Sequence, residues 1–230
     1  GDWSSDVCSS DLEAERYVAA GVKEITLLGQ NVNSYGRDLY GSPRFAQILK
    51  ALDETGVERL RFATSHPKDL SDEVIAQFGS LRSLMPALHL PAQSGSDRIL
   101  QLMNRRYTSA HYRQLVSKLR DACPDIALST DIIVGFPGET EKDFMDTARL
   151  VDEIGYHQVF TFIYSKREGT PAASMEDNTP HEVIQKRFDR LVDIVQAHAF
   201  EKNQLDLEAT IPVLVEGSSK RDELLIAGKS

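Results

Sequence analysis

The chain has 230 residues, of which 41% are hydrophobic and 27% are charged, and its formal net charge is −9. This length fits one large domain, or one domain with a small appendage, and the composition is ordinary for a soluble globular protein. The negative charge argues against a protein whose whole surface binds nucleic acid, and no apolar run reaches the ~18–20 residues of a membrane span.

The first twelve residues, "GDWSSDVCSSDL", are polar and aperiodic, and a helical pattern begins directly after them at Glu13. The string resembles translated sequencing-adapter sequence, so we expect residues 1–12 to be non-native and leave them out of the fold. Cys8 and the single tryptophan are thereby excluded as functional candidates.

The other cysteine, Cys123, stands alone in "DACPD". Two cysteines form no disulfide framework, and they are too few for the four thiolates of an iron–sulfur cluster. We expect Cys123 to be structural and expect no metal ligands in the chain. Since no signal peptide is recognisable, we also expect a cytoplasmic protein.

From residue 23 onward, strand and helix patterns alternate. Strand-like runs occupy residues 23–29, 58–64, 86–92, 125–136 and 157–164. Amphipathic or capped helical patterns follow them, beginning near residues 44, 71, 108, 140 and 179. Strands that alternate with helices in this way form right-handed parallel units, so the sequence predicts an α/β fold.

Polar or glycine-rich segments follow every strand-like run: "GQN", "TSHP", "AQSGS", "GFPGET" and "YSKREGTP". In α/β barrels this rim of strand ends builds the active site. No GxGxxG motif supports a dinucleotide-binding fold. We therefore expect a partial (β/α) barrel, with a doubly wound open sheet as the alternative.

Asp131 lies in the longest strand-like run, "STDIIVGFPGET", among four apolar residues. A strand buried on both faces disfavours an unpaired carboxylate, so either a ligand or a neighbouring basic side chain is expected to satisfy it. A basic run without any acid extends from Arg98 to Arg120, and it is either a solvated helix face or a nucleic-acid contact.

Five segments carry a resemblance to a known family: "LLGQNVNSYG", "LRFATSHP", "LHLPAQSGSDRILQLMNRRYT", "TDIIVGFPGETEKDF" and "FIYSKREGTPAA". Over residues 13–230 the chain resembles the radical S-adenosylmethionine (SAM) methylthiotransferases, and among them the MiaB type, which modifies dimethylallyl-adenosine beside the anticodon of tRNA. The resemblance implies a cytoplasmic, monomeric transferase that uses SAM and 4Fe-4S clusters, acts on tRNA, and takes electrons from a flavodoxin or ferredoxin.

Two features of that family are not found in this sequence: a preceding domain with three cluster-binding cysteines, and a CxxxCxxC loop after the first barrel strand. We therefore expect residues 13–203 to form a radical SAM barrel without its first strand and cluster loop, and the chain alone to be inactive. Residues 204–230 resemble the first strands of the family's RNA-binding TRAM domain.

The resemblance also implies which residues bind SAM. Asp131 would accept hydrogen bonds from the ribose hydroxyls, because a carboxylate offers acceptors only. Gln93 and Arg105 match positions that contact the methionyl part and its carboxylate, and Gln30 and Asn31 match the place that holds its amino group. Gly135 would let the backbone pass close to the ligand.

The substrate-facing residues that we expect at the barrel rim are His66, Arg106, Phe136, Tyr164 and Arg167. Phe136 and Tyr164 are candidates for an apolar wall against the isoprenoid group, with plain core packing as the alternative. A lone histidine is more often structural, which is the alternative for His66. Arg106 is either a helix-end residue or a contact to RNA phosphate. No catalytic side chain is assigned.

Three alternatives remain open from the sequence. Another methylthiotransferase would act on ribosomal protein S12 or on threonylcarbamoyl-adenosine in tRNA. A (β/α) barrel lyase or aldolase would use "GFPGET" as a phosphate cradle, but it needs a catalytic lysine at the end of a strand, and no strand-like run ends on one. A non-catalytic tRNA-binding remnant would use the basic run.

Overall fold

The computed structural model describes residues 7–63, 65–177, 179–205, 207–219, 222 and 224–229. Helix α1 spans Val7–Ala19, so it begins inside the adapter-like string rather than at Glu13, and the predicted boundary after residue 12 falls within a helix. Residues 1–6 lie outside the described part, and the non-native origin of residues 1–12 stays a prediction.

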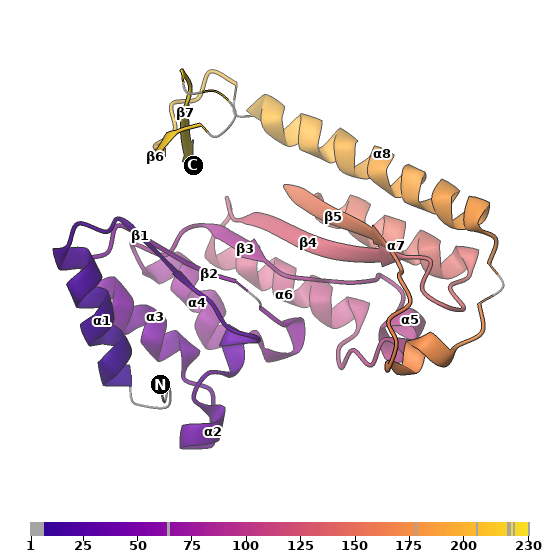
Figure 1. The fold of residues 1–230 in the computed structure, drawn as a ribbon, viewed down its shortest axis with the longest axis horizontal. Helices are drawn as coiled ribbons and strands as arrows, with labels where there is room; N and C mark the ends of the chain where they lie inside the picture. Colours follow the sequence, from indigo (N-terminus) through magenta and orange to yellow (C-terminus); the bar gives the residue numbers. More distant parts are fainter. Residues whose placement is uncertain are drawn as a thin grey trace.

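The first five strands lie where the sequence predicts them, and they are all parallel (Figure 1). They are β1 Glu24–Leu27, β2 Arg59–Phe62, β3 Ala87–His89, β4 Ala127–Val134 and β5 Gln158–Ile163.

The spatial order of these strands follows the chain without a reversal. β1 pairs with β2, and β3, β4 and β5 pair in sequence. A parallel bridge between Leu60 and Leu84 joins the two groups, with the Leu60 amide donating to the Ser83 carbonyl at 2.8 Å. A doubly wound sheet reverses its strand order at a switch point, whereas a barrel does not. The order therefore confirms the partial barrel.

Helices follow each strand, and most begin at the predicted caps. The Ser71, Thr108 and Thr140 side chains accept hydrogen bonds from backbone amides in the first turn of α4, α6 and α7, and Thr140 forms a full capping box with Asp143. The helices are α2 Arg37–Tyr40, α3 Phe45–Glu54, α4 Asp72–Ser80, α5 Asp97–Leu102, α6 Ser109–Ala122, α7 Glu141–Ile154 and α8 His181–Leu205, with short 3₁₀ turns η1 Val32–Ser34, η2 Pro67–Asp69 and η3 Pro171–Ser174.

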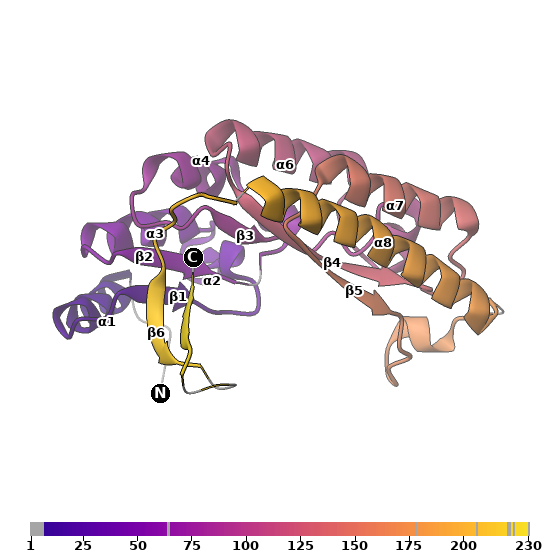
Figure 2. The ribbon, with the colours of Figure 1, turned by 90° about the horizontal axis from the view of Figure 1, so that it is seen from above.

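Helices α4, α6 and α7 lie along one side of the strands (Figure 2). Leu128, Thr130, Ile132 and Val134 of β4 alternate with the other residues of the strand and are buried, while Ala127, Ser129, Asp131 and Ile133 are only partly buried. The expectation that β4 is buried on both faces is therefore wrong. We call the opposite side the open face; it carries Ser129 and Asp131 from β4 and their neighbours on β3 and β5.

The turn after β4 is fixed to helix α8 by a buried ion pair. Arg187 of α8 lies 3.2 Å from Glu139, and the Glu139 carboxylate accepts the Gly135 amide at 3.0 Å. Burial is the largest influence on Glu139 and raises its pKa. The turn also packs directly on α8, because a Cβ on Gly135 would lie 2.6 Å from Ile184.

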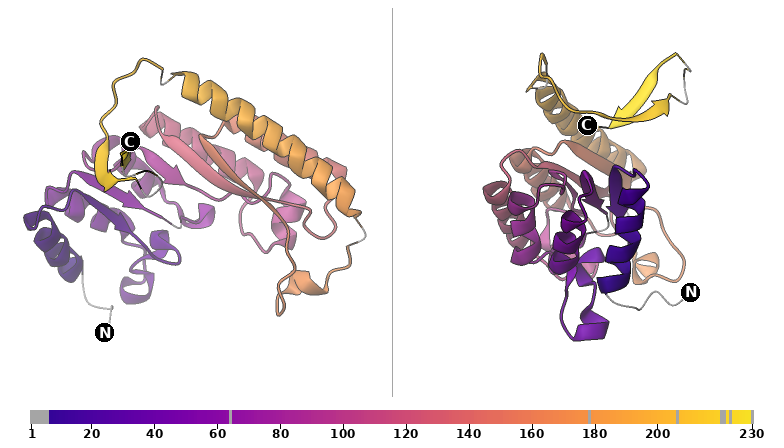
Figure 3. Two further views of the ribbon diagram at one scale, coloured as in Figure 1. Left: turned by 45° about the horizontal axis from the view of Figure 1, so that its top comes forward. Right: turned by 90° about the vertical axis from the view of Figure 1, so that its left-hand side faces the viewer.

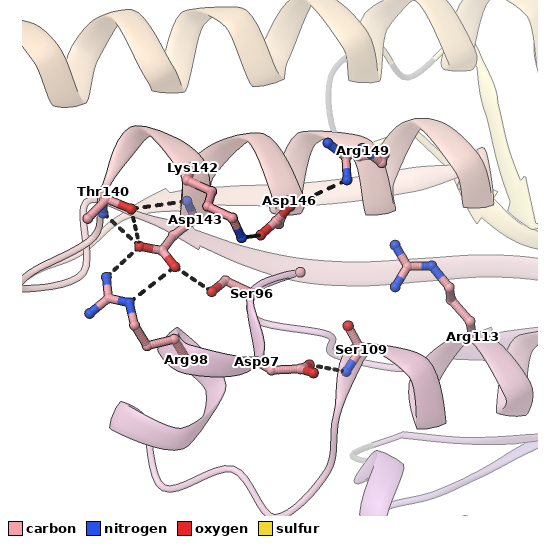
Figure 4. Close-up of a pocket in the computed structure, with 11 residues that line it drawn as sticks. Ser96, Asp97, Arg98, Ser109, Arg113, Thr140, Lys142, Asp143, Asp146 and Arg149 are labelled. Atoms are coloured by element: carbon pink, nitrogen blue, oxygen red, sulfur yellow. Dashed lines mark hydrogen bonds and ion pairs between the residues drawn. The ribbon is translucent and has the colours of Figure 1, made fainter.

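A second polar cluster ties α5 to α7 (Figure 4). Asp143, which is 5% exposed, accepts a hydrogen bond from the Ser96 hydroxyl at 2.6 Å and from the Thr140 amide at 2.9 Å, and it forms an ion pair with Arg98. Burial alone would raise the pKa of Asp143, but these donors together hold it well below its usual range.

The last two strands, β6 Leu214–Ser218 and β7 Ile226–Lys229, form an antiparallel hairpin. Figure 3 shows it joined to the end of α8 by an extended segment. Lys229 lies 3.3 Å from Glu24, and its carbonyl accepts a hydrogen bond from Arg59, so the hairpin touches the beginnings of β1 and β2. The TRAM resemblance of residues 204–230 stays a prediction, and α8 continues past the expected boundary at residue 203.

Among the described helices, none combines the length and the apolar character that a membrane crossing requires.

We predict that Gly135→Ala destabilises the chain more than Gly138→Ala. Both glycines have positive φ, +72° and +78°, so each substitution carries a left-handed strain of about 1–2 kcal/mol. Only Gly135 adds a clash with Ile184, which costs about 1–3 kcal/mol more, since nothing lies within 4 Å of a Cβ at Gly138. Urea unfolding of both variants measures the difference, and equal losses would contradict the packing role.

We also predict that the stability contributed by Asp143 is lost at acidic pH. Because its folded-state pKa is depressed, its contribution is complete above about pH 4 and is lost as the pH falls toward the folded-state value. Asp143→Asn should lower the free energy of unfolding at neutral pH by about 1–3 kcal/mol and flatten the decline below pH ~4.

The matched control is Asp146→Asn, one turn further along α7, where the carboxylate pairs only with the exposed side chains of Lys142 and Arg149. Exposed pairs of this kind contribute about 0–1 kcal/mol. If both variants lost the same stability and kept the same acid profile, the buried cluster would not be the source of the effect.

Candidate functional site

The strand ends and the open face bring several predicted site residues together. Asp131 lies on β4 with its side chain 28% exposed, and it pairs in register with Phe160 of β5. Its Oδ2 lies 3.5 Å from Nε2 of His89, which stands on β3. The carboxylate is thus partly exposed, and no arginine or lysine in the described part of the chain pairs with it, so it remains available to a ligand.

His89 is a residue that the sequence reasoning missed. It stands in "PALHLPA", and like Asp131 it is a polar residue in an otherwise apolar strand. Its ring lies against Phe160 with the centroids 5.9 Å apart, and Nδ1 lies 3.0 Å from the Ser129 hydroxyl. The alternation of side chains along β3 could have indicated that His89 reaches the open face.

Gln93, four residues after the end of β3, occupies a strained backbone conformation. Its φ is +64° although it is not a glycine, and the residue is 8% exposed. Its amide donates to the Asp131 carbonyl at 2.8 Å, and its carbonyl accepts from the Ile133 amide at 2.9 Å. Such strain at a non-glycine residue is typical of functional sites. The backbone hydrogen bonds place Gln93 beside Asp131, and its contact with SAM stays a prediction.

Arg105 and His66 meet at the same rim. Arg105 Nη1 lies 3.4 Å from His66 Nε2, and within the described ranges no carboxylate pairs with Arg105. Burial and then the Arg105 charge lower the pKa of His66. His66 also caps η2, since its Nδ1 accepts the Lys68 amide at 3.2 Å, which favours the structural alternative. Arg105 is left with a guanidinium that can receive an anion.

Unsatisfied polar atoms collect after β1 and β2. The Asn31 amide donates to Asp69 at 2.7 Å, but its Oδ1 is buried without a partner. Asn33 is 1% exposed, and neither its Oδ1 nor its Nδ2 has a hydrogen-bond partner among the described residues. The buried hydroxyl of Ser65 has none there either. Buried polar atoms normally have partners, so this region fits a polar ligand better than an empty core. Gln30 is exposed beside it.

The sequence reasoning also missed Asn33 and Ser65. Both stand inside quoted motifs, "GQNVNSYG" and "TSHP", but nothing in the local sequence distinguishes a buried asparagine or serine from one in a turn.

Phe136 and Tyr164, the two residues expected to form an apolar wall, pack against each other. Phe136 is 5% exposed and its ring meets that of Tyr164 edge to face, with the centroids 5.2 Å apart. This geometry favours the packing alternative for Phe136, while the Tyr164 hydroxyl is buried without a partner. Arg106 and Arg167 are exposed. A side chain at Gly135 would clash with Ile184, so packing explains the glycine at this position.

The basic run from Arg98 to Arg120 does not form a free cationic face. Arg98 pairs with Asp143, Arg113 lies 2.7 Å from Glu153, and Lys118 lies 2.6 Å from Asp72. Arg120 donates to the Ile154 carbonyl. Most of these cations therefore hold helices together, and the prediction that the run as a whole faces RNA is weakened.

A polar hollow of about 440 Å³ lies between α5, α6 and α7 (Figure 4). None of the predicted site residues lines it. Its cations face acids that they already pair with, so we assign it no ligand. The lining residues are Gly95, Ser96, Asp97, Arg98, Ser109, Arg113, Thr140, Lys142, Asp143, Asp146 and Arg149.

The residues fit SAM and do not fit a cluster. An anion receptor at Arg105, an available carboxylate at Asp131 and unpaired buried amides suit an amino-acid nucleoside. In the described part of the chain no group of three or more His, Cys, Asp or Glu side chains could hold a metal. Cys123 is free there, and burial raises the pKa of its thiol, which disfavours the thiolate that a cluster needs.

Comparisons with known proteins agree with this geometry. The family model described as "Radical SAM superfamily" matches residues 11–151, more than half of the chain. Two proteins named tRNA-2-methylthio-N(6)-dimethylallyladenosine synthase are similar: that of Clostridium botulinum (strain Langeland) is 51% identical over 96% of this chain and 49% of its own length, and that of Caldicellulosiruptor saccharolyticus is 52% identical over 93% and 45%. The chain spans about half the length of the curated relatives it matches.

Solved structures support the fold alone. Coproporphyrinogen III oxidase (HemN) from Escherichia coli, described as a radical SAM enzyme, superposes with a TM-score of 0.54 at 16% identity, covering 85% of this chain and 45% of that chain. Methylornithine synthase (PylB) gives 0.52 at 12% identity, covering 81% and 53%. Together with the family match and the unreversed parallel strand order, this establishes that the chain belongs to the radical SAM superfamily.

Proposed function

We propose that the chain is the central part of a tRNA-2-methylthio-N(6)-dimethylallyladenosine synthase. The observation that supports this most is the partly exposed carboxylate of Asp131 beside the strained Gln93, on the open face of a chain that is about half identical to relatives of that name. The reaction would be the methylthiolation of dimethylallyl-adenosine in tRNA, in the cytoplasm, with electrons from a flavodoxin or ferredoxin.

In this proposal the chain's residues bind and orient SAM, which supplies the methyl group and the hydrogen-abstracting radical of the reaction. Asp131 accepts from the ribose hydroxyls and Arg105 receives the methionyl carboxylate. Gln93 contacts the methionyl part, and Asn31 offers its buried Oδ1, which has no partner among the described residues, to the amino group. The thiolates of a 4Fe-4S cluster are not among these residues, so the chain alone is expected to be inactive.

The isoprenoid group of the substrate requires an apolar surface. Phe160 and Phe162 of β5 are 41% and 50% exposed, and they lie on the open face with Asp131 because Phe160 pairs with it in register. Exposed aromatic rings beside the cofactor residues suit a dimethylallyl group better than the buried Phe136 does. We propose that they form the apolar wall, with residues 204–230 acting as a TRAM-like contact to RNA.

The alternatives are less well supported. A non-catalytic tRNA-binding remnant would rely on the basic run, most of which is paired internally. A barrel lyase or aldolase needs a lysine that ends a strand, and β1 to β5 end at Leu27, Phe62, His89, Val134 and Ile163. The relatives that are 51% and 52% identical carry the dimethylallyladenosine name, which favours that substrate over ribosomal protein S12 or threonylcarbamoyl-adenosine.

We predict that a chimera will methylthiolate tRNA that carries the dimethylallyl group. Residues 13–230 would replace the matching segment of the Clostridium botulinum relative, which supplies the remainder of the enzyme. Modified nucleosides would be measured by mass spectrometry after digestion of the tRNA. The chain alone should give no product, and tRNA with unmodified adenosine should not react. Comparable modification of ribosomal protein S12 would contradict the proposed substrate.

We also predict that Asp131→Asn weakens SAM binding without unfolding the chain. The loss of charged hydrogen bonds to the ribose should reduce the binding free energy by roughly 1–3 kcal/mol, as measured by calorimetry. The melting temperature should change little, since the side chain is 28% exposed and contacts only His89 closely. Asp152→Asn, at an exposed carboxylate of α7, is the control. Unchanged affinity with a collapsed melting temperature would instead indicate a structural aspartate.

A further inference from the structure

Three polar side chains form a connected set on the open face. His89 ends β3 and pairs in register with Ser129 of β4, and Asp131 follows two residues later on the same face. His89 Nδ1 lies 3.0 Å from the Ser129 hydroxyl, and Nε2 lies 3.5 Å from Asp131 Oδ2. All three are only partly buried, so a ligand can reach them.

The chemistry of this set determines one tautomer of the neutral imidazole. A ring nitrogen that faces a carboxylate oxygen is favourable only when it carries a proton, so Nε2 is the protonated nitrogen. Nδ1 then has a free lone pair and accepts the Ser129 hydroxyl proton. Phe160 borders the His89 ring edge to face, with the ring centroids 5.9 Å apart.

We infer that His89 is a positioning residue, which holds Asp131 Oδ2 so that Oδ1 faces the ligand hydroxyls. This inference rests on the proposed role of Asp131. The distance of 3.5 Å is at the outer limit of a hydrogen bond, and such contacts often shorten when the ligand binds. His89 orients the carboxylate and Ser129 fixes the ring; neither needs to touch the reacting atoms.

A double-mutant cycle tests the inference in the full chain with SAM as the probe. His89→Phe keeps the aromatic contact and removes both nitrogens, and it should weaken binding by about tenfold. His89→Gln restores an amide donor and should recover part of the loss. In an Asp131→Asn background, His89→Phe should have no further effect, because His89 acts through that carboxylate.

The chain offers a matched control at a second histidine–aspartate pair. His198 of α8 lies 3.0 Å from Asp152 of α7, in the helix layer and away from the open face. His198→Gln should leave the affinity for SAM unchanged. A loss equal to that of His89→Phe would show that any such pair acts through general stability and would overturn the inference.

Nitrogen NMR of the free chain gives a readout that needs no ligand. The neutral His89 ring should show the Nε2–H tautomer, and Ser129→Ala should raise the share of the other tautomer. A dominant Nδ1–H tautomer would overturn the inference.

The outcomes separate the two proposals. If Asp131→Asn leaves binding unchanged, or the wild-type chain binds no SAM, the proposed function fails and the role of His89 fails with it. If Asp131→Asn weakens binding while His89→Phe does not, or if the two losses simply add, only the inference about His89 is wrong.

Discussion

The functional side of this molecule depends on helices covering only one face of a parallel sheet. On the covered face, Leu128, Ile132 and Val134 bury their side chains in the shared core. On the open face, His89 and Asp131 keep about 30% of their side chains exposed, so they avoid the cost of full desolvation. Asp131 can therefore stand in the middle of an apolar strand with only the His89 ring beside it among the described ionisable side chains, and it stays available to a polar ligand.

The turn after β4 shows how packing and binding share one segment. Gly135 has a positive φ and no room for a Cβ, because α8 places Ile184 there. The buried Glu139–Arg187 pair then holds the turn against the same helix. Packing against α8 therefore explains why Gly135 of "GFPGET" is a glycine. Any ligand contact that this turn makes would use a backbone whose position α8 fixes.

Strand positions, helix caps and the barrel order could be predicted, because side-chain alternation and capping residues such as Thr140 act locally. What could not be predicted came from contacts between distant segments. The basic run carries no acid of its own, yet Asp72, Asp143 and Glu153 from other helices pair with it. His89 could not be identified from the sequence for the same reason, because its role depends on Ser129 and Asp131, which strand pairing brings beside it.

The polar groups at the strand ends suit a nucleoside ligand and do not suit an iron–sulfur cluster. Acceptors, amides and one unpaired guanidinium gather at the strand ends, which is the set that an amino-acid nucleoside requires. Soft thiolates, which a 4Fe-4S cluster requires, are not part of that set, and Cys123 has a raised pKa at the far end of α6. The chain is thus proposed to bind and orient the nucleoside, whereas the thiolates of a cluster are not found among its described residues.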